Sequence, residues 1–483
     1  MSDPSFPDNP LEPSTAEMRF LVEAALERVL RHIETLPGQP ADGSAGGVEL
    51  ARLLAEPLPQ EGTPFTDLLD LLFERAVPKS FNTAGPGYLA YIPGGGLFHA
   101  AVADLIADTT NRYTGVFAAA PALAQLEINV LGWLCEMAGY PAGSGGLLTS
   151  GGSLANFTAL TTARRERLPE NFLSGTIYLS DQTHHCVEKS ALLAGFPAAN
   201  VRSIPTDDSF RIRLDALEEQ IEADRQAGLT PFFLVGNAGT TNSGAVDPLD
   251  RLAEIAARHK LWFHVDGAYG GPFVLTDEGR RILAGIEKSD SLVLDPHKGF
   301  FLPYGTGALL IRDAPALRRA HSVAADYMPP LQDEPLDFSE TSPELSRPFR
   351  GLRLWLPLKM MGIAPFREAL EEKMELARWA ADELRKIEGV ELLSEPELSL
   401  FAFRYVPPGR DLDGAEALDR LNRLNRDWLA RTNARQRVHL TGTMLGERYA
   451  LRICVLSFRT HRDRMEMAVE DLRLALEEIQ GQR

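Results

Sequence analysis

The most informative stretch of the chain is Leu292-Val293-Leu294-Asp295-Pro296-His297-Lys298. Three apolar residues predict a buried strand, which ends abruptly in a polar turn that carries one lysine. A lysine at the end of a core strand is placed to condense with an aldehyde, because desolvation lowers its pKa toward the nucleophilic amine. On its own, the stretch fits a surface lysine after an edge strand equally well.

Two other apolar segments end in polar residues, and these favour the interpretation of Lys298 as a reactive lysine. Residues 261–265 form one, and Asp266 follows it. Residues 147–149 form the other, and Ser150-Gly151-Gly152-Ser153 follows it and opens a helical pattern. A lysine, a carboxylate and a phosphate-sized glycine loop are the three parts that a pyridoxal 5'-phosphate site requires. The sequence therefore predicts such a site.

Short apolar segments alternate with helical segments between residues 85 and 315. The predicted strands are 147–149, 176–180, 201–204, 231–236, 261–265, 291–295 and 307–311, and the helices between them include 153–168, 184–194, 214–226 and 248–259. This pattern is typical of an α/β domain whose mostly parallel sheet, here of seven strands, is covered by helices on both faces. Ligands bind beyond the carboxyl ends of such strands. Ser150, Asp266 and Lys298 all lie there.

The flanking regions differ from this core. Amphipathic helices are predicted from Ser14 and over residues 66–76, with a linker at 37–47 between them. Residues 321–346 have no clear period and are rich in proline, as functional lids often are. A C-terminal α/β part follows, with strands at 390–393, 399–405 and 449–456 and a last helix at 461–479. We expect three units: 1–84, helical and dimer-forming; 85–350, cofactor-binding; and 351–483, a small domain.

Composition excludes several classes of function. The net charge of −18 argues against binding nucleic acid or an anionic membrane through a positive surface. Three cysteines, Cys135, Cys186 and Cys454, form no CxxC, so neither a disulfide framework nor a metal site is expected. No apolar run has membrane-spanning length, and the first residues do not form a signal peptide. The expected location is the cytoplasm.

Each candidate motif also has a purely structural interpretation. The glycine loop fits an ordinary N-cap turn, and it matches no nucleotide-binding fingerprint. Asp266 fits a turn cap, although the small residues after it would let a flat ring lie against the backbone. His184 is placed to stack on a cofactor ring, but a lone histidine is more often structural. Thr241 fits either a contact to the cofactor's 3'-oxygen or a plain turn.

Taken together, the motifs resemble those of the group II pyridoxal-phosphate-dependent amino acid decarboxylases, whose best-known members act on aromatic L-amino acids. The resemblance is collinear over nearly the whole chain and rests on Gly87–Pro93, Ala120–Leu123, Ser150–Asn156, Ser180–His184, Gly239–Thr241, His264–Tyr269, Pro296–Lys298 and Phe349–Trp355. It implies the fold-type I architecture of aspartate aminotransferase. It also implies homodimers that exchange their N-terminal segments and share active sites.

The resemblance also implies a role for each matching residue. Lys298 would bind the cofactor covalently, Asp266 would pair with its ring nitrogen, and His184 would stack on the ring. Tyr327 would protonate the substrate α-carbon after CO₂ leaves. Further cofactor contacts would come from Gly152, Ser153, Thr241, Ala268 and His297, and the substrate pocket would include Tyr91, Ile92, Pro93 and Gly94.

The sequence departs from many family members at Asp295, where asparagine is common, and at Gly299, where tryptophan is frequent. The expected activity is α-decarboxylation of an amino acid substrate, with aromatic ones favoured. The alternatives are an aldehyde-forming or transaminating relative, a carbon–carbon lyase of the sphingosine-phosphate lyase type, and a pyridoxal-phosphate-binding regulatory protein without turnover. Tyr327 argues against the aldehyde synthases, in which phenylalanine is typical at this position.

Overall fold

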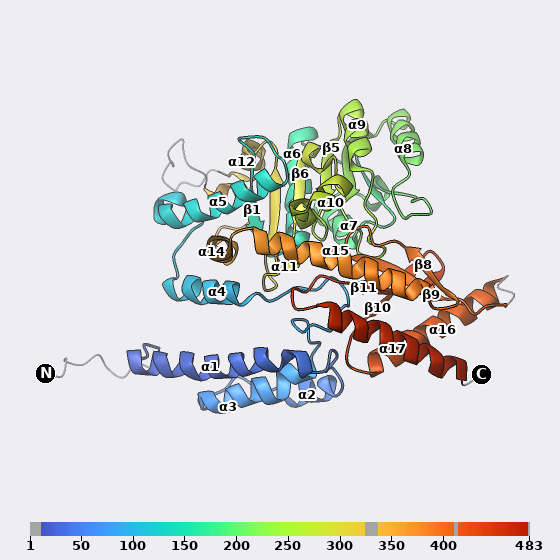
Figure 1. Ribbon diagram of the computed structural model, residues 1–483. Helices are drawn as coiled ribbons and strands as arrows, with labels where there is room; N and C mark the ends of the chain where they lie inside the picture. Colours follow the sequence, from blue (N-terminus) through green and yellow to red (C-terminus); the bar gives the residue numbers. More distant parts are fainter. Residues whose placement is uncertain (1–10, 324–336, 410–413, 482–483) are drawn as a thin grey trace.

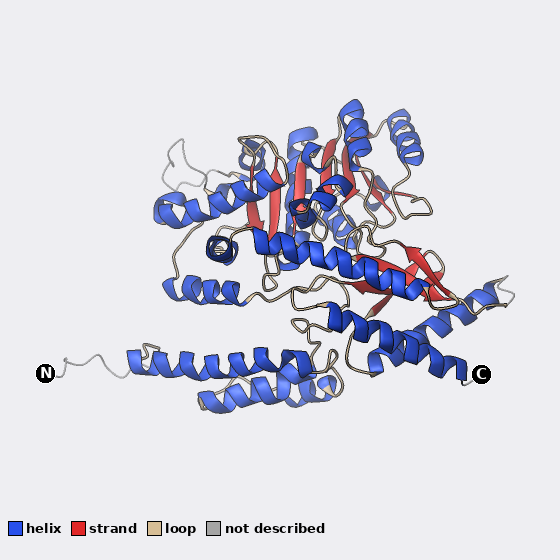
Figure 2. Cartoon of the chain, in the orientation of Figure 1, coloured by secondary structure: helices blue, strands red, loops and turns tan. Residues whose placement is uncertain are grey.

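The structure is a computed structural model that describes residues 11–323, 337–409 and 414–481. Figure 1 shows a layer of N-terminal helices below a large body, with the C-terminal helices at one end of that body. Figure 2 shows two separate groups of strands, both surrounded by helices. The larger group carries the predicted site, and the smaller belongs to the C-terminal part of the chain.

The N-terminal layer consists of α1 (Thr15–Thr35), α2 (Gly47–Leu53) and α3 (Phe65–Asp70), which continues as a π-helical turn (Leu71–Ala76). Ser14 caps α1 in a capping box with Glu17, which satisfies free N–H groups at the helix start. No residue of α1 is buried. The predicted helices are therefore present, but α1 is only partly covered by its own chain, and Phe20 and Leu21 remain exposed.

The large sheet has the strand order β1-β7-β6-β5-β4-β2-β3. Its strands are β1 (Gly145–Thr149), β2 (Gly175–Ser180), β3 (Val201–Ile204), β4 (Thr230–Asn237), β5 (Trp262–Asp266), β6 (Ser291–Leu294) and β7 (Gly307–Ile311). β7 is antiparallel to both of its neighbours, and the remaining pairs are parallel. The predicted mostly parallel, seven-stranded sheet is confirmed.

Helices cover both faces of this sheet, and others lie beyond the ends of its strands. They are α4 (Phe98–Thr110), α5 (Pro121–Met137), α6 (Gly152–Arg167), α7 (His185–Leu193), α8 (Leu214–Gln226), α9 (Leu249–His259), α10 (Asp277–Ile282), α11 (Pro296–Gly299), α12 (Pro315–His321), α13 (Phe338–Thr341) and α14 (Gly351–Met361). In β6, Leu292 and Leu294 pack into one apolar core, whereas Val293 packs into the core on the other face. This alternation follows from the two-residue period of a strand and explains why the strand sequences are apolar throughout.

The smaller sheet is antiparallel, with the order β10-β11-β9-β8. Its elements are α15 (Ala364–Arg385), β8 (Val390–Ser394), β9 (Leu400–Tyr405), α16 (Ala415–Ala434), β10 (Thr441–Leu445), β11 (Arg448–Cys454) and α17 (Arg462–Gly481). Strand β10 was not predicted, because it is a mostly part-exposed edge strand that lacks a run of apolar residues. Across the three described stretches of chain, no helix combines the length and the apolar character that crossing a bilayer would require.

Candidate active site

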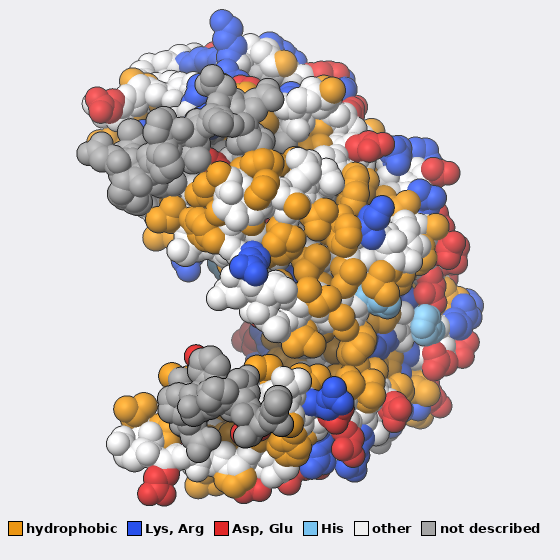
Figure 3. All heavy atoms as spheres, turned by 90° about the vertical axis from the view of Figure 1, so that its left-hand side faces the viewer, with side chains coloured by type: hydrophobic (Ala, Val, Ile, Leu, Met, Phe, Trp, Pro, Cys, Tyr) orange, Lys and Arg blue, Asp and Glu red, His pale blue; other side chains and the backbone are white. Residues whose placement is uncertain are grey.

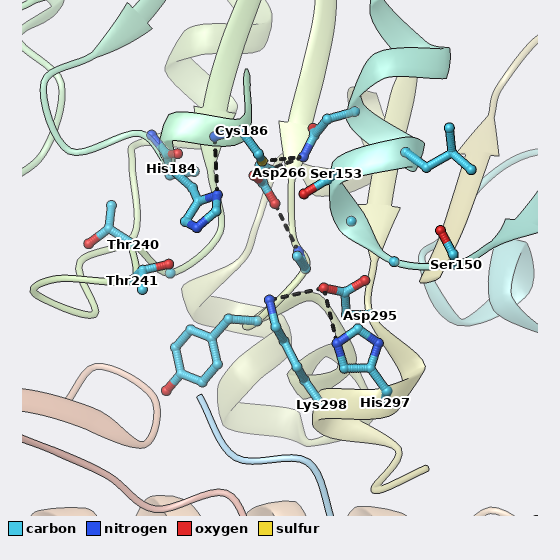
Figure 4. A pocket seen from close by; sticks show the side chains of 18 residues that line it. Ser150, Ser153, His184, Cys186, Thr240, Thr241, Asp266, Asp295, His297 and Lys298 are labelled. Carbon is cyan, nitrogen blue, oxygen red and sulfur yellow. Dashed lines mark hydrogen bonds and ion pairs between the residues drawn. The ribbon is translucent and has the colours of Figure 1, made fainter. Parts of the chain in front are cut away.

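The carboxyl ends of β1, β5 and β6 meet around one cavity of about 300 Å³ (Figure 4). The glycine loop after β1, Asp266 at the end of β5 and Lys298 after β6 all line it. These groups are far apart in sequence, and the parallel strands place them at one edge of the sheet. The cavity therefore contains all three parts that the sequence predicted.

Lys298 lies on α11, the short helical turn that follows β6. Its Nζ lies 2.9 Å from Asp295 Oδ2, and its side chain is 20% exposed. Burial pulls the pKa of Lys298 down, but Asp295 and, more weakly, Asp266 outweigh it, so the pKa stands above its ordinary value. The expectation that desolvation lowers this pKa was therefore wrong, because it did not consider a carboxylate one helical turn away.

Asp266 is held by a chain of buried hydrogen bonds. Asn156 on α6 donates Nδ2–H to Asp266 Oδ2 over 3.2 Å, and the backbone N–H of Ala268 donates to Oδ1 over 3.1 Å. Asn156 Oδ1 lies 2.7 Å from His264 Nε2, and His264 Nδ1 lies 2.7 Å from Ser291 Oγ. The carboxylate is therefore fixed in both position and orientation.

The direction of this chain follows from the groups that can only donate or only accept. Trp262 Nε1 lies 2.7 Å from Ser291 Oγ, and an indole N–H can only donate. Asn156 Oδ1 is an amide oxygen and can only accept, so His264 carries its proton on Nε2 and donates it to Asn156. The neutral ring then accepts at Nδ1 from the Ser291 hydroxyl, which itself accepts from Trp262. Burial lowers the pKa of His264 to about 4, which keeps the ring neutral at neutral pH, as this arrangement requires.

The glycine loop leads into the N-terminus of α6, where Gly152 and Ser153 line the cavity. The first N–H groups of a helix have no intrahelical acceptor, and the helix dipole adds positive potential there. A Cβ on Gly307, in the neighbouring strand β7, would lie 2.5 Å from the backbone carbon of Gly151, so only glycine permits this close packing. The end of the cavity at α6 can therefore receive an anionic group.

Two histidines border the cavity. His184 Nδ1 accepts from the backbone N–H of Cys186, which makes His184 the N-cap of α7. Burial lowers the pKa of His184 despite the opposing pull of Asp266, so the ring is neutral and carries its proton on Nε2. His297 donates Nδ1–H to the carbonyl of Thr306 over 2.7 Å, and burial lowers its pKa as well.

Other predicted residues also lie at this cavity. Thr241 and Ala268 line it, and Ala268 is 8% exposed. Residues that the sequence did not assign to the site include Asn156, Cys186, Asn237 and Tyr269. Asn156 lies four residues after Gly152 on the same helix face, and that spacing was the one signal that could have identified it.

The predicted substrate-pocket residues are divided in space. Ile92 is part of the apolar core, whereas Tyr91 lines a second cavity of about 490 Å³ together with Thr241. Thr241 lines both cavities, so they adjoin one another. A Cβ on Gly94 would lie 2.9 Å from the carbonyl oxygen of His297, which places this glycine against the Lys298 turn. Pro93, which lies between Ile92 and Gly94 in the sequence, is also buried. Tyr327 lies outside the described residues.

Comparison with known proteins identifies relatives of this arrangement. Residues 48–406 match the pyridoxal-dependent decarboxylase conserved domain. The chain is 34% identical over 472 residues to an aromatic-L-amino-acid decarboxylase of Bacillus atrophaeus, which covers 97% of each protein. It is 29% identical over 476 residues to tryptophan decarboxylase TDC1 of Camptotheca acuminata, which covers 95% of this chain and 93% of that protein.

Two solved structures are similar in fold over almost their whole length. One is Oryza sativa TDC with pyridoxal phosphate and tryptamine, with a TM-score of 0.91, 27% identity, and coverage of 98% of this chain and 99% of that one. The other is Catharanthus roseus tryptophan decarboxylase in complex with L-tryptophan, with a TM-score of 0.89, 26% identity, and coverage of 96% and 99%.

Proposed function

The chain belongs to the pyridoxal-dependent decarboxylase family, and we propose that it converts aromatic L-amino acids into the corresponding amines and CO₂. It is a pyridoxal-phosphate-dependent amino acid decarboxylase, a carboxy-lyase. The observation that carries the proposal is the meeting of Lys298, Asp266 and the α6 N-terminus in one cavity. The relatives named above, which act on aromatic amino acids, support the substrate class.

The residues present fit pyridoxal phosphate. Lys298 supplies an amine for the aldehyde, and the N-terminus of α6 supplies N–H groups for the phosphate. Asp295 Oδ1 is buried without a hydrogen-bond partner among the described residues, so the site holds a polar atom that only a ligand or solvent would satisfy. Ala268 lines the cavity with a small side chain, which leaves room for a ring. When bound, this cofactor supplies the electron sink for the electron pair of the broken Cα–carboxylate bond.

The protein contributes charge and position to this chemistry. Asp266, fixed by Asn156 and Ala268, holds a negative charge where a protonated ring nitrogen would be stabilised. His184 supplies a neutral ring for stacking and an Nε2–H that can donate to the substrate carboxylate. Lys298 would hold the cofactor through its aldehyde. These groups are arranged in advance, so little reorganisation is needed during the reaction.

An aromatic substrate is supported by the second cavity. Its walls include Phe81 and Tyr91, and the rings of Phe81 and His439 stack at 4.9 Å. Gly94 lets the backbone pack closely against the Lys298 turn and Tyr304, since a Cβ there would meet the Tyr304 ring at 3.0 Å. We propose that residues 91–94 and this cavity receive the substrate side chain. Aromatic rings favour such partly apolar, ring-lined surroundings.

We propose further that the protein is a homodimer whose active sites use both subunits, with residues 1–84 as the dimerisation segment. Figure 3 shows a hollow between the N-terminal layer and the body, with apolar side chains gathered on the body. Phe20 on α1 and Leu105 on α4 are 53% and 52% exposed. A second copy would bury surfaces of this kind, as obligate dimers do. The cytoplasm is the proposed location, because all three cysteines are unpaired.

An amino acid panel tests the activity. The purified holoenzyme is incubated with aromatic, acidic and aliphatic L-amino acids, and amine, aldehyde, hydrogen peroxide and CO₂ are measured. We expect amine and CO₂ in equal amounts, highest with an aromatic amino acid. Tyr327→Phe should lose amine formation, because phenylalanine has no proton to give to the α-carbon. Amine from acidic amino acids only would refute the substrate class, and aldehyde from the wild type would favour the aldehyde-forming alternative.

A further inference from the structure

Asp295 is a buried carboxylate that the decarboxylation chemistry above does not use. Its side chain is 4% exposed, and Oδ2 lies 2.9 Å from Lys298 Nζ. Its other oxygen, Oδ1, is buried and has no hydrogen-bond partner among the described residues. Buried carboxylate oxygens normally have partners, because leaving one without costs free energy. Asp295 Oδ1 is therefore available to form a hydrogen bond with a bound ligand.

The position of Asp295 indicates which group that is. A Cβ built on Gly152 would lie 3.0 Å from Oδ2 and 3.3 Å from Oδ1, so the carboxylate lies against the first residue of α6. That helix end is also where the cofactor phosphate would bind. Two anionic groups side by side in a buried site repel each other, unless one of them carries a proton.

The charged and titratable groups around Asp295 come from three elements. Lys298 and His297 are on α11, with His297 Nε2 at 3.7 Å from Oδ2. His184 and Cys186, at the start of α7, also line the cavity, as do Asp266, at the end of β5, and Tyr269, just after it. Both histidines have lowered pKa values, so Lys298 is the cation of this group at neutral pH.

Lys298 must lose a proton before it can react with an aldehyde, since only the neutral amine is nucleophilic. In this structure the amine is held in its charged form, chiefly because Asp295 offsets the effect of burial. Asp295 Oδ2, at hydrogen-bond distance from Lys298 Nζ, is placed to accept this proton. A proton that moves to Asp295 would neutralise both members of the pair at the moment when a phosphate enters beside them.

We propose that Asp295 takes the proton that Lys298 loses when pyridoxal phosphate binds, and that the resulting carboxylic acid donates a hydrogen bond to the phosphate. The ammonium of Lys298 gives one proton to Asp295, and the neutral amine then forms a C=N bond with the aldehyde carbon. The C–O bond breaks, and the oxygen leaves as water with the two remaining amine hydrogens. The proposal rests on Lys298 being the cofactor-binding lysine.

The proposal predicts that the wild type and Asp295→Asn release different numbers of protons when they bind the cofactor. In the wild type the proton stays in the site. In Asp295→Asn burial is no longer offset by Asp295, so the pKa of Lys298 falls, and only below that pKa does binding send a proton to solvent. That pKa is therefore measured first on the free variant. By linkage, the ratio of the wild-type Kd for pyridoxal phosphate to the Asp295→Asn Kd should rise about tenfold per pH unit below the pKa of Lys298 in the variant, and level off above it. The surface variant Asp313→Asn, at a residue 60% exposed on its side chain, is the control and should follow the wild type.

The experiment is a titration of each apoprotein with pyridoxal phosphate, followed calorimetrically in two buffers of different ionisation enthalpy that contain neither phosphate nor a primary amine. We expect the wild type to release one proton fewer per bound cofactor than Asp295→Asn at a pH below the pKa of Lys298 in the variant. Equal proton counts, or Kd curves that run parallel with pH, would show that Asp295 does not change its ionisation and would overturn the proposal.

Two further measurements test the proposal without the variant and test the assignment of Lys298 separately. If Asp295→Asn does not fold, the wild type alone is titrated at about pH 8 with pyridoxal phosphate and with pyridoxal, which lacks the phosphate; at that pH the free phosphate is fully ionised. Pyridoxal should release about one proton more, and equal release would contradict the proposal. Borohydride reduction and peptide mapping report separately on Lys298, so a label on another lysine would refute the site assignment itself.

Discussion

Asn156 donates a hydrogen bond of 3.2 Å to Asp266, and this contact connects the helix that begins at the phosphate end of the cavity with the carboxylate at its other end. Both residues are buried. The helix that would hold the cofactor phosphate therefore also orients the carboxylate for its ring nitrogen. This explains how a short cavity can position both ends of one cofactor.

Asp266→Asn should keep pyridoxal phosphate but lose most decarboxylation. The phosphate and lysine contacts remain, whereas an amide cannot hold the ring nitrogen protonated. We expect a fall in kcat of at least about 100-fold, the scale on which single electrostatic stabilisers act. Cofactor content by absorbance and amine formation by chromatography are measured on the same sample. Near-normal turnover with full cofactor content would refute the role of Asp266.

His264 should make the stability of the apoprotein dependent on pH. Its pKa is about 4 in the folded protein and near 6.5 when unfolded, so the unfolded chain binds more protons between these values. The stabilisation is complete above about pH 6.5 and is lost as the pH falls toward 4, by about 3 kcal/mol. His264→Gln should make the loss of unfolding free energy over this range smaller. An unchanged slope would mean that His264 is not held neutral.

Glu127 and Arg347 form a buried ion pair that should be important for stability. Arg347 Nη2 lies 2.5 Å from Glu127 Oε1, and both side chains are almost fully buried. Glu127 also accepts from the backbone N–H of Gly351. Glu127→Ala would leave a buried guanidinium without its partner and should cost about 3–5 kcal/mol. Thermal unfolding measures this change.

The control for Glu127 is a pair that is similar in chemistry but exposed. Glu254 lies 3.4 Å from Arg251 on α9, and both side chains are more than half exposed. Glu254→Ala should leave the Tm nearly unchanged, because exposed ion pairs contribute little. Similar Tm losses in the two variants would contradict the importance of burial.

The dimer proposal predicts that charges on the uncovered apolar surface will separate the subunits. Phe20→Asp and Leu105→Asp should shift the protein from dimer to monomer in sedimentation and lower its activity. Leu193→Asp, on α7, is the control, since Leu193 is 67% exposed but lies outside the N-terminal layer and α4. A wild-type protein that is monomeric at micromolar concentration, and active after removal of residues 1–80, would refute the proposal.

The sequence predicted the large sheet well because its strands are buried on both faces, which makes them apolar throughout and easy to recognise. Strand β10 was missed because an exposed edge strand carries no such pattern. Lys298 and Asp266 were predicted to share a site because each follows a core strand, and both line the cavity. The hydrogen bonds from Trp262 to Asp266 depend on side chains that meet across three strands and a helix. The raised pKa of Lys298 depends on the turn geometry that brings Asp295 to it. Neither can be read from local sequence.

The most direct test of the account is the identity of the lysine that binds the cofactor. The holoenzyme is reduced with borohydride, which fixes the cofactor on the lysine it occupies, and is then digested and mapped by mass spectrometry. We predict that the label is on Lys298 and that Lys298→Ala folds but is colourless. A label on Lys288 or Lys359 would contradict the account.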